Sequence, residues 1–296
     1  MPPSSPSTRI SKTTTSSRAT WEPGWRAAQT GAVIANLTGV GVVTIEGPDA
    51  RRFANGMFTQ NVNALASGSA TRSAFCDDRG RMLGMMDLYC TGLDAFLAVL
   101  EGVSAADFVD RFARFVIFDE LEMTDRTDEV ALVTLQGAGT DTVWQAGGHG
   151  APDQGWVGDS PHGVGRHDRT GLGGFDFLLP RADREAALEG LEKAGAMPVA
   201  SEVLEVLRVE AGLPCWPVDM GERAFPHEMG LRDTTLDFDK GCYVGQEIIN
   251  RMDTRGTMRR QLSGLRVEGE ELVPVGAVVT ADGKEVGVLT SPVWSP

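Results

Sequence analysis

The sequence predicts an α+β protein built of two or three lobes, and three observations support this. The chain has 296 residues and is 42% hydrophobic, which is enough for more than one core at the usual size of domains. Short β-branched stretches are interspersed with stretches of helical periodicity along the chain. The last part of the chain is β-rich, which is typical of α+β rather than all-helical proteins.

Strands and helices are predicted in turn through the first half of the chain. The β-branched run GVVTIEG at 41–47 predicts a strand closed by glycines. PDARRFANGMF at 48–58 predicts a helix that starts at its proline. Residues 70–90 predict a hairpin that turns at DDRG. Ser104 is the expected cap of a helix with a stripe of core phenylalanines, Phe108, Phe112 and Phe115.

Two helices and several strands are predicted in the second half. The helices are 181–195, which ends at Gly195, and the one that Ser201 caps and Gly212 closes. The strands are expected at 130–137, 175–180, 261–269 and, as a hairpin turning at Asp282 and Gly283, 277–291.

Residues 1–28 are predicted to be a disordered tail. The first twenty are rich in Ser and Thr, carry Arg9, Lys12 and Arg18, and contain no acid and no apolar core. This composition excludes a secretory signal and is typical of disorder. A transit-like peptide is the alternative, although the segment has no amphipathic pattern.

Charge and cysteine content exclude several classes of protein. The formal net charge of −14 disfavours a nucleic-acid partner. The sequence contains no run of 18 apolar residues, so we expect no membrane span. The histidines have no helical partner and the cysteines no zinc-type spacing, so we expect no metal. Few cysteines in a long chain indicate a reducing compartment, the cytoplasm, or the mitochondrial matrix if the protein is eukaryotic. The cysteines are Cys76, Cys90, Cys215 and Cys242.

Cys242 stands in the unusual stretch DKGCYVGQEIINRMDTRG, residues 239–256. Asp239 is expected to cap a helix that begins near 242–244, and Lys240 is two residues from the sulfur. A helix N-terminus and a nearby cation both favour the thiolate, so Cys242 is a candidate nucleophile. The alternative is a small side chain buried at a tight turn.

Two carboxylates are further candidates. Glu210 lies in the last turn of a predicted helix, where an acid opposes the helix dipole and needs a partner. Its two oxygens suit the aminopyrimidine edge of a pterin or purine, and an ion pair with an arginine is the alternative. Asp87 lies in an apolar strand on the same face as Met85. It is a candidate acid/base or amine-binding group, unless that face is wet.

Several motifs resemble one family. KGCYVGQE at 240–247 resembles the signature of the folate-binding YgfZ family. RVEAGLP at 208–214 resembles a segment that this family shares with the glycine cleavage T-protein, an aminomethyltransferase. GPDARRFANGMFTQNV at 47–62 and CDDRGRM at 76–82 resemble its opening segments in the same order. Asp87, Asp219 and FPHE at 225–228 resemble features of the T-protein branch, so the chain combines both branches.

The resemblance implies a three-lobed T-protein-like fold around a central folate pocket. The implied parts are an N-terminal lobe at 29–120 completed by 201–250, a middle lobe at 121–200, and a small, incomplete C-terminal β-barrel at 255–296. It also implies tetrahydrofolate, or a one-carbon derivative of it, as the ligand. Carried onto this chain, the catalytic residues are Cys242 and Asp87, and the folate-binding residues are Glu210, Lys240, Gly241, Tyr243, Gly245, Gln246, Glu247 and Arg251.

The resemblance favours one function and leaves two others open. The expected function is a tetrahydrofolate-binding accessory protein that assembles or repairs iron–sulfur enzymes, with iron–sulfur client or scaffold proteins as partners. The first alternative is a tetrahydrofolate-dependent aminomethyltransferase. The second is a structural or redox protein that binds no folate.

Overall fold

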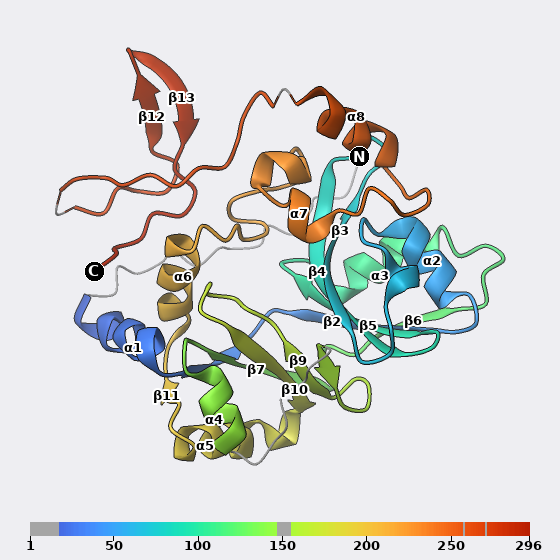
Figure 1. Cartoon of the computed structure of the whole chain (residues 1–296), viewed down its shortest axis with the longest axis horizontal. Helices are drawn as coiled ribbons and strands as arrows, with labels where there is room; N and C mark the ends of the chain where they lie inside the picture. The colour runs from blue at the N-terminus through green and yellow to red at the C-terminus, as the bar shows by residue number, and fades with distance from the viewer. Residues whose placement is uncertain (1–17, 147–154, 257, 270) are drawn as a thin grey trace, which may run out of the picture.

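The structure is a computed structural model that describes residues 18–146, 155–256, 258–269 and 271–296. Two large β-sheets lie next to each other, helices cover their outer faces, and the C-terminal part of the chain runs across one end (Figure 1). The α+β class predicted from the sequence is therefore confirmed.

The first sheet has five antiparallel strands. They are β2 (Gly41–Glu46), β3 (Ala70–Cys76), β4 (Met82–Gly92), β5 (Ala95–Glu101) and β6 (Glu122–Asp125), in the spatial order β3-β4-β5-β2-β6. β3 and β4 form the hairpin predicted around DDRG, where Gly80 has a φ of +73° that favours glycine. One face is covered by α2 (Ala50–Met57), η1 (Val62–Ala64) and α3 (Ala105–Ala113).

The predicted phenylalanine stripe on α3 is only partly correct. Ser104 caps the helix as expected, because its Oγ accepts a hydrogen bond from the backbone N–H of Asp107 at 3.0 Å. Phe108 and Phe112 are buried in the core against α2. Phe115 is 39% exposed, since α3 ends at Ala113 and the chain leaves the helical path before it.

The second sheet has six strands and helices on both faces. Its strands are β1 (Val33–Leu37), β7 (Val130–Gln136), β8 (Trp156–Val157), β9 (Gly163–Arg166), β10 (Gly174–Pro180) and β11 (Met197–Pro198), in the spatial order β11-β1-β7-β10-β9-β8. The helices are α1 (Arg18–Thr30), α4 (Thr140–Ala146), η2 (Arg181–Asp183), α5 (Arg184–Lys193) and α6 (Ser201–Glu210). Ile34 of β1 faces the core under α4 and α5, whereas its neighbours Val33 and Ala35 face α1 and α6.

Helix α1 corrects the predicted tail. Residues 18–28 are helical rather than disordered, and residues 1–17 lie outside the described residues. Trp21 and Ala28 are buried against α6, which provides the hydrophobic burial that composition alone did not reveal. No helix in the described part of the chain is both long enough and apolar enough to span a bilayer.

The two sheets meet face to face at Tyr89. This side chain of β4 is fully buried, and its ring lies 4.9 Å from that of Trp156 on β8. Gly165 of β9 lies against the same ring, because a Cβ added there would be 2.3 Å from it. The absence of a side chain at Gly165 thus lets the sheets approach each other.

The remaining part of the same β4 face is covered by the C-terminal third of the chain. Met85 of β4 packs against Trp216, Leu231 and Tyr243 in one apolar cluster. The short elements here are η3 (Pro226–Met229), α7 (Arg232–Thr235) and α8 (Gln246–Arg255).

Beyond α8 the strand predictions are partly wrong. The hairpin of β12 (Val278–Ala281) and β13 (Lys284–Val288) turns at Asp282 and Gly283, both with positive φ, as predicted. Residues 261–269 form no strand, because exposed Leu265 and Val267 find no sheet to pack on. A β-barrel at 255–296 is not confirmed, since this hairpin is the one sheet among its described residues.

We predict that Gly165→Ala lowers the free energy of unfolding by about 2 kcal/mol, because the added methyl group overpacks the Tyr89 ring at the contact between the sheets. Urea denaturation measures this. Gly190→Ala is the matched control: Gly190 lies exposed in α5 with open space around it, and the change should stabilise the protein by about 0.5–1 kcal/mol. Equal effects of the two changes would contradict the predicted close packing.

Candidate functional site

Asp87 lies where three parts of the molecule meet. On β4 it stands between Met85, which packs under the C-terminal third, and Tyr89, which packs on the second sheet. Its side chain is 9% exposed, so the alternative of a wet strand face is wrong. A carboxylate at such a position needs compensating charge.

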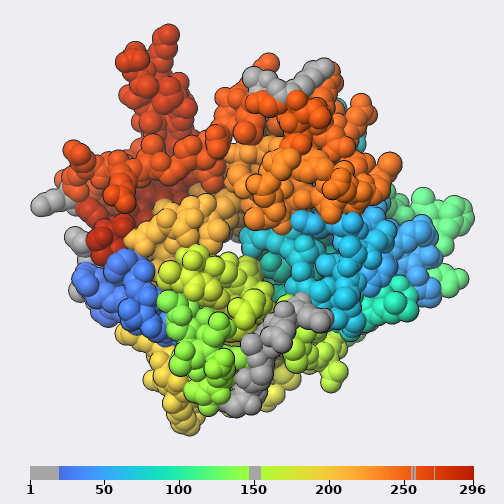
Figure 2. Space-filling view, in the orientation of Figure 1, coloured from blue at the N-terminus to red at the C-terminus, as the bar shows by residue number. Residues whose placement is uncertain are grey.

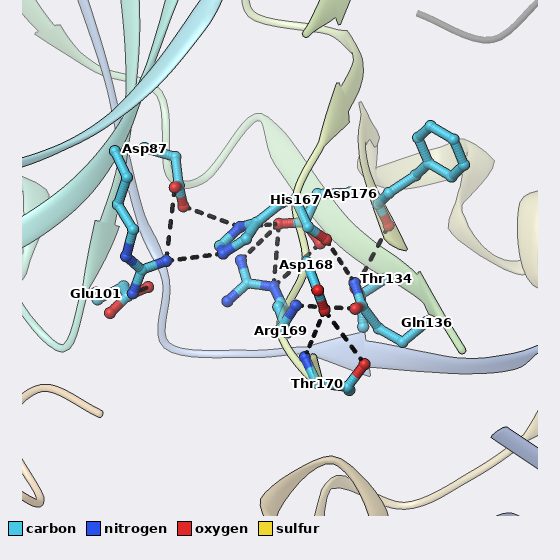
Figure 3. A network of polar contacts seen from close by, with 11 residues as sticks. Asp87, Glu101, Thr134, Gln136, His167, Asp168, Arg169, Thr170 and Asp176 are labelled. Atoms are coloured by element: carbon cyan, nitrogen blue, oxygen red, sulfur yellow. Dashed lines mark hydrogen bonds and ion pairs between the residues drawn. The ribbon is translucent and has the colours of Figure 1, made fainter. Parts of the chain in front are cut away.

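The first sheet supplies part of that charge. Arg72 lies directly opposite Asp87 in the β3–β4 pairing, and its Nη1 is 3.7 Å from Oδ1 of Asp87. Its Nη2 donates to Oε1 of Glu101, on β5, at 2.6 Å. Asp87 and Glu101, which Arg72 joins, lie in the left part of the network in Figure 3.

The second sheet supplies the rest through the connection between β9 and β10. His167 Nδ1 lies 2.9 Å from Oδ2 of Asp87 and 3.2 Å from Oδ2 of Asp176 on β10. Asp176 is fully buried and also accepts from Arg169, at 2.5 to 3.1 Å. The network therefore joins the two sheets through buried charges (Figure 3).

These charges keep the carboxylates ionised. Burial disfavours the charge on Asp87, but His167, Arg72 and Arg169 outweigh it and hold the pKa of Asp87 below its ordinary value. At Asp176, Arg169 and His167 also outweigh the effect of burial, and they lower the pKa of this carboxyl. Burial and Arg169 lower the pKa of His167, yet the two carboxylates raise it further, and the net direction is upward. At neutral pH Asp87 is therefore a buried anion.

The same residues offer a metal-like set of ligands. Oxygen and nitrogen atoms of Asp87, Glu101 and His167 lie within 4.8 Å of one another. The Arg72 guanidinium already occupies this set, since it donates to Glu101 and lies 2.9 Å from Nε2 of His167. A divalent cation would face that guanidinium at close range, so the geometry favours an ion-pair network over a metal site.

Cys242 is exposed, and the helix expected to begin at it begins at Gln246 instead. Gly245 precedes α8 with a φ of +84°, and a Cβ there would lie 2.5 Å from the backbone oxygen of Asp77. This close approach to the β3–β4 turn forces a tight bend before the helix. The predicted cap at Asp239 and the helix dipole at Cys242 are therefore wrong.

Lys240 does not serve the cysteine either. Its Nζ donates three hydrogen bonds, to the backbone oxygens of Asn55 at 2.7 Å, Phe58 at 2.7 Å and Gln60 at 2.6 Å. Burial lowers the pKa of Lys240 to about 7, while the three bonds are those of the protonated amine. Lys240 thus satisfies the free carbonyls at the end of α2.

A cavity of about 400 Å³ adjoins Cys242 and residues of α2. It shares no residue with the Asp87 network, so the two predicted catalytic residues stand in separate environments. Its lining residues are Arg52, Phe53, Asn55, Gly56, Met57, Asn63, Phe115, Asp119 and Cys242.

The remaining motif residues mainly support or border α8. Tyr243 is buried, and the Nζ of Lys240 lies 4.8 Å from the centre of its ring. Gln246 is the first residue of α8 and is half-buried. Gly241, Glu247 and Arg251 are exposed, and the structure brings none of them to Asp87.

Glu210 ends α6 as predicted, but its partners are not arginines. Its Oε2 accepts from Nε1 of Trp25 on α1 at 2.7 Å, and its Oε1 accepts from Oγ of Ser295 at 2.5 Å. The buried acid near it is Asp219, which pairs with Arg208 and accepts from Ser291 at 2.6 Å. The Glu210 side chain is outside the Asp87 network.

A hollow opens in the middle of one face of the molecule (Figure 2). It lies where the yellow-green, gold, orange and cyan parts of the chain meet. The network comes from β3, β4, β5, the β9–β10 connection and β10, which belong to the cyan and yellow-green parts of the chain.

Sequence reasoning found Asp87 and missed its partners. The hairpin at DDRG indicates that a residue of β3 close to Arg72 lies opposite Asp87, but a β-bulge between Phe75 and Cys76 shifts the register by one residue, so the turn alone does not identify the partner. His167, Arg169 and Asp176 gave no such signal, because they come from the other sheet.

Known proteins resemble this chain along most of its length. The model of the GCVT N-terminal domain family matches residues 10–240. An aminomethyltransferase of Rubrobacter xylanophilus is 29% identical over 278 residues, covering 91% of this chain and 74% of that protein. An aminomethyltransferase of Herpetosiphon aurantiacus is 26% identical over 281 residues, covering 92% and 77%.

One solved structure shares the fold. The crystal structure of glycine cleavage system aminomethyltransferase T from Bartonella henselae superposes with a TM-score of 0.80. The match covers 91% of this chain and 76% of that one, at 20% sequence identity. At this identity the likeness shows a common fold.

We predict that Lys240→Met lowers the free energy of unfolding by about 3 kcal/mol, because three carbonyl oxygens lose their donor. Urea denaturation followed by tryptophan fluorescence checks this. The control is Lys193→Met on the surface of α5, where the change should stay within about 0.5 kcal/mol. A Lys240 variant as stable as the control would refute the capping role.

We also predict that iodoacetamide labels Cys242 at least about tenfold faster than Cys76 or Cys90 near neutral pH. Cys242 is exposed, whereas the other two are buried and burial raises the pKa of the Cys76 thiol. Cys215 should be intermediate, since burial raises its pKa to about 11. Peptide mass spectrometry of the native protein measures the rates, and equal labelling would contradict the exposure of Cys242.

Proposed function

Because this chain belongs to the family of the GCVT N-terminal domain, we propose that it binds tetrahydrofolate and catalyses a one-carbon transfer of the aminomethyl type. The observation that carries the proposal is the ionised, buried carboxylate of Asp87. Its Oδ2 makes no hydrogen bond among the described residues, although His167 Nδ1 lies 2.9 Å away. An acceptor oxygen that its neighbouring donor does not fully satisfy is the kind of group that a ligand amine completes.

The proposed role of Asp87 follows from its charge. Tetrahydrofolate supplies the amine nitrogens that accept a one-carbon unit. An ionised carboxylate accepts a hydrogen bond from such an amine and takes up its proton. Arg72 and His167 favour the ionised form, so Asp87 is ready for this role at neutral pH.

The predicted pterin contact at Glu210 requires a change of partners. Both of its oxygens already accept, from Trp25 and from Ser295. To hold a pterin, Glu210 would exchange these two hydrogen bonds for bonds to the ligand. Arg251, exposed on α8, remains a proposed contact for the anionic tail of the folate.

The iron–sulfur role expected from the cysteine motif is not the function we propose. The relatives described above are named aminomethyltransferases, and none of these names refers to iron–sulfur proteins. A stable cluster usually needs four ligands, and the cavity beside Cys242 has one thiol. The aminomethyltransferase alternative therefore has the better support.

We predict that Asp87→Asn lowers kcat on the order of 10²- to 10⁴-fold, because the neutral amide cannot take up a proton. The assay mixes protein, tetrahydrofolate and an aminomethyl donor and measures methylenetetrahydrofolate. Calorimetric titration with tetrahydrofolate measures binding separately, and urea denaturation verifies that the variant folds.

Two control variants sharpen this test. Cys242→Ala and Asp128→Asn should retain turnover, since Cys242 lies outside the network and Asp128 is fully exposed. Absence of tetrahydrofolate binding by the wild type would overturn the proposal. Full turnover by a folded Asp87→Asn variant would remove Asp87 from the mechanism.

A further inference from the structure

His167 connects the two sheets within the network and has no role in the sequence motifs. Its ring is 6% exposed and lies between Asp87 on one sheet and Asp176 on the other, with Arg72 at its far nitrogen. We infer that His167 is a positioning residue for Asp87, holding the carboxylate in place for the proposed one-carbon transfer. This inference rests on the proposed function.

The main chain of His167 is held as firmly as its ring. Its N–H donates to the backbone oxygen of Gly174 at 3.1 Å, and its backbone oxygen accepts from Nε2 of Gln136 at 2.9 Å. Gln136 is fully buried, and its Oε1 accepts from the N–H of Arg169. A side chain fixed in this way is suited to orient a second group.

The position of Arg72 determines which ring nitrogen of His167 carries the proton. Nη1 of Arg72 lies 2.9 Å from Nε2, and a guanidinium can only donate. Nε2 must therefore offer its lone pair, and the proton of the neutral ring is on Nδ1. This proton faces the carboxylates of Asp176 and Asp87.

This tautomer separates positioning from proton transfer. A ring with its proton on Nδ1 cannot accept a proton from Asp87 at that atom, and Nε2 is occupied by Arg72. His167 therefore orients Asp87 and keeps it ionised but does not relay its proton. The arrangement resembles a catalytic group held in place by a fixed neighbour, where small displacements are costly.

Protonation of the ring would change the network. A proton on Nε2 would face the Arg72 donor at 2.9 Å, so Arg72 would have to move. The charged groups around His167 come from five parts of the chain: Arg72 from β3, Asp87 from β4, Glu101 from β5, Arg169 from the β9–β10 connection and Asp176 from β10. Burial, together with the carboxylates of Asp87 and Asp176, raises the pKa of the Tyr89 phenol. Turnover should fall on the acid side as His167 becomes charged, because Arg72, which holds the ring at Nε2 and lies 3.7 Å from Asp87, is then displaced.

The test compares two substitutions that each keep a polar group at the place of one ring nitrogen. In His167→Asn the amide stands near the place of Nδ1, and in His167→Gln it stands near the place of Nε2. We expect His167→Gln to lose kcat on the order of 10²-fold, with KM for tetrahydrofolate changed little. His167→Asn should recover most of that loss, and it should shift the acid limb of the pH profile.

Two NMR measurements need no turnover, and the first of them uses the wild type alone. Nitrogen-15 NMR of the imidazoles should show His167 with its proton on Nδ1. Carbon-13 NMR should show the carboxyl of Asp87 titrating at higher pH in His167→Gln than in the wild type. His162→Gln, in the turn before β9, is the control and should leave Asp87 unchanged.

The outcomes distinguish this inference from the proposed function. A proton on Nε2 in the wild type, or an unchanged titration of Asp87 in a folded His167→Gln protein, would overturn the positioning role. Equal losses of kcat in folded Asn and Gln variants would overturn it as well. If the wild type lacks turnover, the proposed function fails, and the NMR experiments still decide whether His167 holds Asp87.

Discussion

The buried charges between the two sheets are the constraint on which the structure depends. Asp87 and Asp176 lie on different sheets, and His167 stands between them at 2.9 and 3.2 Å. Removing one partner of such a buried set leaves an uncompensated charge, which costs about 3–5 kcal/mol. The sheets must therefore pack in one relative position, and the contact of Tyr89 with Gly165 is consistent with that position.

The same network of charges also keeps a carboxylate ionised in the interior of the molecule. A charge network made only for stability would be replaceable by apolar residues of similar volume. Here the network keeps a carboxylate ionised at the meeting point of three parts of the chain. The fold is shared with an aminomethyltransferase, and the charges around Asp87 keep the carboxylate that we propose as the reactive group ionised.

Two residues of the KGCYVGQE motif, Lys240 and Gly245, support the backbone of distant segments. The sequence suggested that Lys240 activates Cys242, but the amine is held by one carbonyl in the last turn of α2 and two in the segment that follows it. Gly245 is required for a close approach to the β3–β4 turn. Both roles depend on segments more than 150 residues away, so spacing within the motif could not reveal them.

Interactions between residues close in the sequence determine several local elements of this protein. The β3–β4 hairpin, the cap at Ser104 and the turn at Asp282 depend on neighbours within a few residues, and the sequence predicts them. Tertiary structure alone decided the helix at 18–28, the missing strand at 261–269 and the partners of Asp87. Arg72 and His167 are 95 residues apart, and their contact exists only because two sheets pack together. Burial and charge compensation are properties of that packing, and no local pattern encodes them.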